Sequence, residues 1–233
     1  MRGSPAPFGG RSAADGGLAA YMRTVYGYMT AGLGLTGVIA AWLMGNPETL
    51  AAFTGSIWFW VALIGELGLV VVLSLTITRM SGMAAFAMFM VYSALNGLTI
   101  APLTYMYTTE SVAGVFFVTA GMFASLSFYG FVTKRDLSAM GKFLFMALIG
   151  LIIVMVVNIF VASSMLGLLI SAAAVLIFAG LTVYDTQKIK ELYSDVAGDS
   201  ENTHRAAVLG ALTLYLDFIN MFLHLLRLFG QRK

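Results

Sequence analysis

Long uncharged stretches constrain this chain more than any other feature of its sequence. Of its 233 residues, 60% are hydrophobic and 10% are charged, whereas a soluble domain carries roughly 25% charged residues. A helix needs about 20 mostly apolar residues to cross a bilayer. The uncharged stretches are residues 24–47, 49–65, 80–109, 111–133 and 143–184. Their lengths predict an all-α integral membrane protein.

Seven transmembrane helices are expected from these stretches. The last stretch has room for two helices, and Asn158 with the ASSMLG sequence that follows marks the break between them. The predicted spans are roughly residues 25–44, 57–77, 83–105, 112–132, 143–162, 165–187 and 206–229. Residues 1–20 contain Gly, Pro and Ser without an apolar core, so we expect a flexible cytoplasmic tail rather than a signal peptide. Residues 21–233 would form the membrane domain.

The distribution of Lys and Arg indicates the orientation. Ten basic residues fall on one side of the predicted spans and none falls in the three connections of the other side. The ten are Arg2, Arg11, Arg23, Arg79, Lys134, Arg135, Lys142, Lys188, Lys190 and Arg205. Because cytoplasmic loops are enriched in Lys and Arg, we expect a multi-pass inner (plasma) membrane protein with a cytoplasmic N-terminus. The last segment either crosses fully, which places Arg232 and Lys233 outside, or dips in and returns.

The last span carries a row of polar side chains. Residues three or four apart share one face of a helix, so these side chains form one stripe. The stripe consists of Gly210, Thr213, Asp217, Asn220, His224 and Arg227. A mid-membrane aspartate costs about 2.5–3.5 kcal/mol even on a lenient insertion scale, and such residues usually face the bundle interior or a water-filled path. We therefore expect the other helices to surround this one.

Structural alternatives exist for most of the stripe. Thr213 and Asn220 would otherwise hold helices together by hydrogen bonds, and His224 and Arg227 would extend to the membrane interface. For Asp217 a functional role is the preferred interpretation, because its position in the membrane is costly.

Asp185, in the sequence GLTVYDTQKIKELY at residues 180–193, is the expected partner of Asp217. Its alternative role is to end the sixth span at the cytoplasmic interface. Two carboxyl groups in a dry site cannot both ionise cheaply, so such a pair shares a proton over part of the physiological pH range. Without that proton the pair attracts a cation, and carboxylate oxygens suit Ca²⁺. The pair is a candidate proton sensor and a candidate Ca²⁺ ligand set.

Several classes of function lack their required residues. With no cysteine, the chain has no disulfide framework, iron–sulfur cluster or thiolate zinc site, and His204 and His224 form no metal-ligand cluster. The net charge of +2 is spread over loops, which argues against a nucleic-acid partner. No Gly-x-Ser-x-Gly, His-Glu-x-x-His or phosphate loop occurs. We expect no enzymatic activity and no cofactor.

Four stretches resemble the Bax inhibitor-1 (transmembrane Bax inhibitor motif) family, of the bacterial YccA/YbhL-like kind. They are YSALNGLTIAPL at 92–103, VTAGMFASLSFYGFVTKRDLSAMG at 118–141, GLTVYDTQKIK at 180–190 and ALTLYLDFINMFLHLLRLFG at 211–230. The resemblance implies six helices around a central C-terminal seventh. It also implies a pH-sensitive Ca²⁺ leak gated by Asp185 and Asp217.

The resemblance further implies a latch on the aspartate pair. In related bacterial proteins a buried arginine after the second span, together with an acidic residue in that span, holds the pair closed. Arg79 and Glu66 stand at the matching places, although Glu66 lies 13 residues before Arg79, slightly farther than the family pattern. The loop between the aspartates, with SDVAGDSENTHR, is also longer than in the best-understood bacterial relatives.

The expected function is a Ca²⁺ leak whose partners are Ca²⁺, protons and the lipid bilayer. One alternative is an interaction protein that modulates a membrane-bound ATP-dependent protease, or a stress or cell-death response, and another is a proton-coupled cation exchanger. An intramembrane aspartyl protease also carries two late aspartates. Its Gly-x-Gly before the second aspartate and its later Pro-Ala-Leu are missing here, because LYL precedes Asp217 and no proline follows Pro102.

Overall fold

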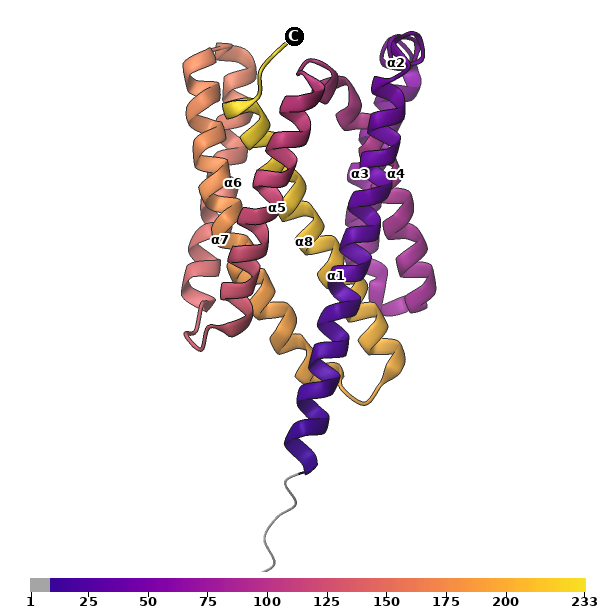
Figure 1. Cartoon of the computed structure of the whole chain (residues 1–233), viewed down its shortest axis with the longest axis vertical. Coiled ribbons are helices and arrows are strands. Elements are labelled where there is room, and N and C mark those ends of the chain that lie inside the picture. Colours follow the sequence, from indigo (N-terminus) through magenta and orange to yellow (C-terminus); the bar gives the residue numbers. More distant parts are fainter. Residues whose placement is uncertain (1–8) are drawn as a thin grey trace, which may run out of the picture.

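The chain folds into a bundle of long helices. The computed structural model describes the backbone of residues 9–233 and the side chains from Gly16 onward. Its elements are α1 (Gly9–Met44), α2 (Pro47–Thr54), α3 (Ile57–Thr76), the short 3₁₀ helix η1 (Ile77–Arg79), α4 (Gly82–Tyr105), α5 (Thr109–Val132), α6 (Ser138–Val161), α7 (Ser164–Val196) and α8 (Ser200–Phe229). Figure 1 shows the long helices running along the long axis, with the short α2 at one end.

Seven of these helices are long and apolar enough to cross a membrane, namely α1, α3 with η1, and α4 to α8. Large apolar side chains such as Trp58, Phe160 and Leu176 are more than half exposed on the outside of the bundle. An outer surface of this kind suits lipid rather than water. The predicted all-α membrane class with seven spans is confirmed.

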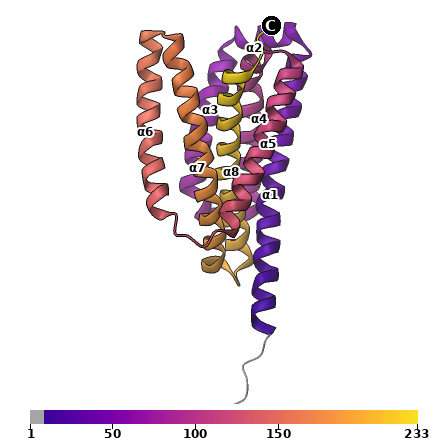
Figure 2. The same cartoon turned by 60° about the vertical axis from the view of Figure 1, so that its left-hand side comes forward.

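Helix α8 forms the centre of the bundle. It is buried along most of its length and packs against α7, α1, α5 and α4. Helix α3 packs mainly on α4, and α6 packs mainly on α7, so these two lie farther out (Figure 2). The expected central C-terminal helix is therefore present, with four of the six other spans in extensive contact with it.

The break predicted near Asn158 separates α6 from α7. Ala162 ends α6 with a φ of 52°, a left-handed conformation that a helix interior cannot contain. The side-chain oxygen of Asn158 accepts a hydrogen bond from the backbone N–H of Ser163 at 3.2 Å. The Ser163 hydroxyl in turn caps α7 by accepting from the N–H of Leu166. Local polar side chains thus make the turn between two adjacent apolar spans.

Helix α1 begins earlier in the chain than the predicted first span. It starts at Gly9, and its apolar span starts at Gly16, while residues 1–8 lie outside the described part of the chain. Near this end α1 meets the end of α7, which itself extends past the predicted residue 187 to Val196. Tyr21 is buried, and its ring lies 5.2 Å from that of Tyr193 between centroids.

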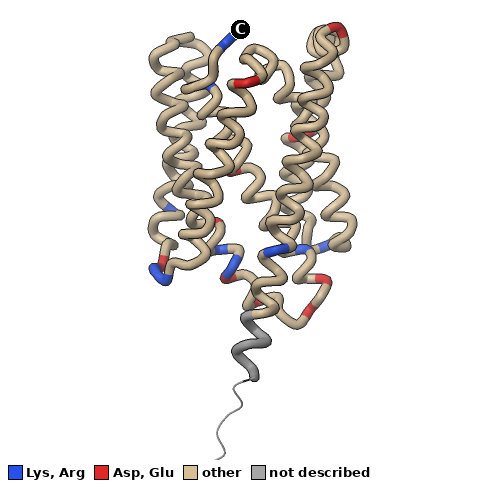
Figure 3. Tube along the Cα trace, in the orientation of Figure 1, with Lys and Arg blue, Asp and Glu red and all other residues tan. Residues whose placement is uncertain are grey.

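The two ends of the bundle differ in charge. Lys and Arg gather at the end where α1 begins (Figure 3), and we call this the basic end and the opposite one the far end. Helix α8 runs from the basic end to the far end, where the C-terminus lies (Figure 1). There the N–H of Thr108 donates to the carbonyl of Gln231, and that of Lys233 donates to the carbonyl of Met106. Of the two alternatives left open by the sequence, a helix that spans the whole length of the bundle fits a full crossing rather than a segment that dips in and returns.

Candidate functional site

Asp185 of α7 and Asp217 of α8 meet inside the bundle. Asp217 is only 4% exposed and Asp185 is half-buried. Their carboxyl groups lie within interaction distance of each other. An ionised carboxylate only accepts hydrogen bonds, so the two groups can bond to each other only when one of them carries a proton. The second oxygen of Asp217, Oδ2, is buried and has no hydrogen-bond partner among the described residues.

Small residues allow the helices that carry the pair to approach closely. A Cβ atom on Gly210 of α8 would lie 3.0 Å from Ile189 of α7. On the other side of α7, Gly130 of α5 lies directly against the backbone carbonyl of Val183. Such contacts exclude larger side chains, because interiors are packed without spare volume. The position of Asp185 is therefore determined by tight packing on both sides of α7.

Four residues of the polar stripe predicted on α8, Thr213, Asp217, Asn220 and His224, line one cavity. This inner cavity has a volume of about 690 Å³ and lies between α6, α7 and α8. Its polar lining consists of Lys142, Tyr184, Asp185, Thr213, Asp217, Asn220 and His224. Apolar side chains of α6, such as Phe145 and Leu151, form the opposite wall. These four stripe residues therefore face a cavity, and Asp185 of α7 lines the same cavity beside Asp217.

The far end of the stripe reaches α7. His224 Nδ1 lies 3.3 Å from the hydroxyl of Ser171, within hydrogen-bonding distance. The guanidinium of Arg227 packs directly against Gly167 near the amide of Asn158, and Arg227 is exposed. His224 thus belongs to the cavity, whereas Arg227 lies at the far end of the bundle, as the interfacial alternative expected.

A second cavity lies on the basic-end side of the pair. This outer cavity, of about 410 Å³, is lined by Asp185, Lys188, Ile189, Glu191, Leu192, Ser194, Asp195, Leu209, Gly210 and Thr213. Asp185 and Thr213 line both cavities. Asp185, with Asp217 next to it in the inner cavity, therefore lies where the two cavities adjoin.

The structure does not bring Arg79 to the aspartate pair. Leu73 and Ile77 are buried at the end of α3, and η1 then turns Arg79 to the exposed surface of the basic end. Within residues 16–233, Arg79 makes no ion pair or side-chain hydrogen bond, and the salt bridge present is that of Arg205 with Glu201. The expected buried arginine latch is absent from this conformation, because the inward positions of this turn carry apolar residues.

Glu66 also lies away from the pair and belongs to another polar network. The Thr99 hydroxyl lies 2.8 Å from Glu66 Oε2 and 3.1 Å from the backbone carbonyl of Asn96, and can donate to either oxygen. Tyr215 of α8 donates to Asn96 Oδ1 at 3.0 Å and shares a 2.6 Å hydrogen bond with Thr36 of α1. The network connects α3, α4, α8 and α1.

Sequence reasoning missed the roles of Thr36, Asn96 and Tyr215. Asn96 had a detectable signal, since an amide inside an uncharged span needs a partner. Thr36 and Tyr215 had none, because a lone Thr or Tyr is common in membrane helices. Tyr215 also lies outside the α8 stripe, two residues before Asp217.

The described residues contain no group of three or more His, Asp or Glu side chains able to hold a metal ion. Ca²⁺ takes six to eight oxygen ligands, and the pair supplies only the oxygen atoms of its two carboxylates. Thr213 and Asn220 add a hydroxyl and an amide oxygen in the same cavity. Water molecules would have to complete the coordination shell of a Ca²⁺ ion here. Such a site suits transient binding of the ion better than permanent binding.

These features define a polytopic all-α membrane protein with a buried carboxyl pair on its central helix. The chain matches the family described as "Inhibitor of apoptosis-promoting Bax1" over residues 18–233. It therefore belongs to the Bax inhibitor family, as its four motif stretches predicted.

Relatives share nearly the whole length of the chain. It is 46% identical over 220 residues to "Inner membrane protein YbhL" of Escherichia coli (strain K12), covering 93% of this chain and 94% of YbhL. An uncharacterised protein of Deinococcus radiodurans is 45% identical over 213 residues, covering 91% and 90% of the two chains. One of Borreliella burgdorferi is 41% identical over 215 residues, covering 91% and 92%. The named relative and the seven apolar helices together indicate a multi-pass membrane protein.

Proposed function

We propose that this protein is a pH-sensitive Ca²⁺ leak of the inner membrane, gated by Asp185 and Asp217. The observation that carries the proposal is the position of Asp185, which lines both the inner and the outer cavity and lies next to Asp217. Separation of the two aspartates would join the two cavities. The proposed activity is passive transport, without a cofactor or a catalytic step.

The proton on the pair gives the gate its pH dependence. At low pH the pair keeps the shared proton, and one carboxyl group donates to the other. As the pH rises the proton leaves, and two carboxylates face each other at hydrogen-bonding distance, where like charges repel. Repulsion favours a state in which α7 and α8 separate at this point. The free energy by which protonation shifts this equilibrium cannot exceed the difference in proton binding between the two states. Ca²⁺ influx is therefore expected to increase with pH.

The inner cavity supports a cation as the transported species. Its polar lining on α8 offers oxygen atoms from Thr213, Asp217 and Asn220, the hard ligands that Ca²⁺ prefers. Lys142 also lines this cavity, at the basic-end start of α6. A lysine at the entrance disfavours tight cation binding without closing the path.

The basic end is proposed to face the cytoplasm. Lys and Arg gather at this end (Figure 3), where the α3–α4 connection carries Arg79 and the α5–α6 connection carries Lys134 and Arg135. Lys and Arg are enriched on the cytoplasmic side of membrane proteins. In this orientation the outer cavity opens to the cytoplasm, and the C-terminus lies outside.

The direct test is Ca²⁺ entry into liposomes. The purified protein is reconstituted in vesicles that hold a Ca²⁺ dye, and influx is recorded across neutral pH for the wild type and for Asp217→Asn. Asp136→Asn, in the exposed α5–α6 connection outside both cavities, is the matched control. The proposal requires a pH-dependent influx that Asp217→Asn flattens and Asp136→Asn leaves unchanged.

Two other outcomes would redirect the proposal. Proton movement opposite to Ca²⁺, detected with a pH dye inside the vesicles, would indicate the exchanger. Influx no greater than in empty vesicles would contradict the leak and favour the interaction protein, with a membrane-bound ATP-dependent protease as the partner to test.

A further inference from the structure

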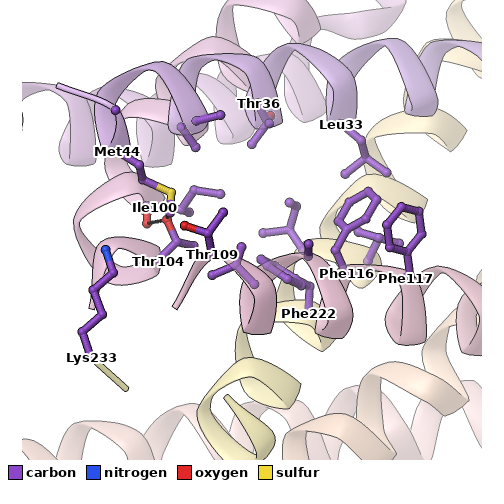
Figure 4. A pocket seen from close by; sticks show the side chains of 18 residues that line it. Leu33, Thr36, Met44, Ile100, Thr104, Thr109, Phe116, Phe117, Phe222 and Lys233 are labelled. Carbon is purple, nitrogen blue, oxygen red and sulfur yellow. Dashed lines mark hydrogen bonds between the residues drawn. The ribbon is translucent and has the colours of Figure 1, made fainter. Parts of the chain in front are cut away.

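A long groove between α1 and α5 takes no part in the proposed ion path. It consists of two hollows of about 1000 Å³ and 500 Å³ that share Leu33, Gly37, Ala41, Phe116 and Phe218. The larger hollow lies toward the basic end and the smaller one toward the far end. Figure 4 shows the smaller hollow, with Leu33 and Thr36 on one side, Phe116 and Phe117 on the other, and Lys233 at its end. We call the two hollows together the α1–α5 groove.

The groove opens to hydrocarbon rather than to water. Helices α1 and α5 do not pack extensively on each other, and Phe218 of α8 lines both hollows between them. The rim is apolar and exposed, since Val38 is 68% exposed, Phe117 72% and Phe128 68%. All three residues lie within membrane spans. A water-soluble partner cannot reach this site, whereas lipid chains surround it.

Two glycines on α1, Gly34 and Gly37, keep the groove open. A Cβ atom added to Gly34 or Gly37 would meet no atom within 4 Å. Gly97 of α4 differs, because its Cβ would lie 2.8 Å from the carbonyl of Thr36, so there the glycine serves helix packing. Gly34 and Gly37 serve no such contact within the described chain. Their effect is to leave a space of the size that small ligands occupy.

Cationic side chains lie at the basic-end mouth. Arg23 is the charged residue among the described side chains that line the larger hollow, and it is exposed. Lys190 lies beside the hollow, with its Nζ 5.3 Å from the ring centroid of Phe131 and bonded to the Phe131 carbonyl. The rest of the lining is apolar apart from a few hydroxyl groups, two of which, on Tyr26 and Ser127, bond to each other at 2.6 Å. The groove therefore has a guanidinium group at its mouth and an apolar lining below it. A phospholipid has the complementary arrangement, a phosphate group above acyl chains, and arginine forms paired hydrogen bonds to phosphate.

We infer that the α1–α5 groove binds one anionic phospholipid from the basic-end leaflet. Its phosphate lies at Arg23, and its acyl chains follow the groove past Gly34 and Gly37 to Phe218. Basic pockets between transmembrane helices recognise anionic head groups in this way. The bound lipid fills the gap between α1 and α5 and touches the central helix at the residue after Asp217.

Native mass spectrometry in detergent tests this assignment. The full-length protein is titrated with phosphatidylglycerol and, separately, with phosphatidylcholine carrying the same acyl chains. The wild type should retain one phosphatidylglycerol preferentially. Arg23→Gln should lower the affinity for phosphatidylglycerol about fivefold, the effect of one cation near an anionic surface, and leave phosphatidylcholine unchanged. Arg135→Gln, an exposed arginine at the same end but outside the groove, is the matched control.

A second pair of variants tests the groove itself. Gly37→Leu places a side chain where both hollows meet and should abolish retention of the lipid. Gly68→Leu is the control, since a Cβ on Gly68 of α3 also meets nothing within 4 Å, and Gly68 lies outside the groove. Retention unchanged in Gly37→Leu, or equal retention of the two lipids by the wild type, would overturn the assignment. A dimer that Gly37→Leu dissociates would also overturn it, by giving the groove to a second copy of the chain.

Discussion

Tyr215 and Asp217 lie two residues apart on α8 and face opposite sides of the bundle. The Tyr215 hydroxyl donates to Asn96 of α4, while the Asp217 carboxyl lies against that of Asp185 of α7. The central helix is thus held by one polar contact on its α4 side and by a proton-dependent one on its α7 side. The change proposed for the gate breaks the second contact and leaves the first in place.

The two aspartates should act as one titrating unit. Asp185→Asn and Asp217→Asn each remove the like-charge repulsion that opens the gate, because an amide stays neutral and can donate to the remaining carboxylate. We expect each variant to flatten the pH profile of Ca²⁺ influx, and the double variant to be no flatter than either. Liposome influx in all four proteins checks this. Additive effects would show that the aspartates act independently.

Arg79→Gln should leave the pH profile unchanged. In this structure the arginine is exposed and contacts neither aspartate, so removing its charge does not alter the pair. The measurement is the same influx assay, with Arg135→Gln as an exposed basic-end control. A shifted profile in Arg79→Gln alone would mean that the arginine reaches the pair in another conformation, as the family resemblance implied.

Tyr215→Phe should destabilise the bundle. The variant keeps the ring but leaves the Asn96 oxygen without its donor in a buried site, and an unsatisfied buried polar group costs about 1–3 kcal/mol. Thermal unfolding in detergent measures the loss. Tyr129→Phe is the control, because Tyr129 is 48% exposed and such substitutions usually stay within about 0.5 kcal/mol. Equal melting curves for both variants would contradict a structural role for the network.

Gly130→Ala should weaken the packing that positions Asp185. The new Cβ atom would collide with the backbone carbonyl of Val183, which cannot move aside as a side-chain end can. Overpacking of this kind typically costs about 1–3 kcal/mol. Gly121→Ala on the same helix meets nothing within 4 Å and should not lower stability. Melting temperatures of the two variants provide the comparison, and equal values would show that α5 and α7 adjust freely.

The orientation can be tested with single cysteines, since the chain contains none. Arg232→Cys lies at the far end and Lys134→Cys at the basic end. If the basic end faces the cytoplasm, a membrane-impermeant maleimide added to intact cells should label Arg232→Cys and not Lys134→Cys. Labelling both after the membrane is permeabilised is the control. The reverse pattern would invert the proposed orientation.

The sequence by itself determined the seven spans, the break near Asn158 and the polar stripe of α8. These follow from local properties, because apolar length decides what crosses a bilayer and the 3.6-residue period decides which side chains share a face. The meeting of Asp185 with Asp217 was also predictable, since two carboxyl groups in adjacent spans are costly unless they find a partner.

Only the tertiary structure decided the position of Arg79, the network of Thr36, Asn96 and Tyr215, and the extension of α8 from one end of the bundle to the other. It also decided where α1 begins and where α1 and α5 leave a groove. Each of these depends on how far one helix is rotated and shifted against another. That depends on contacts between residues distant in the sequence, such as Gly130 with Val183 and Tyr21 with Tyr193. A single sequence records which side chains share a helix face, but not which face of another helix they meet.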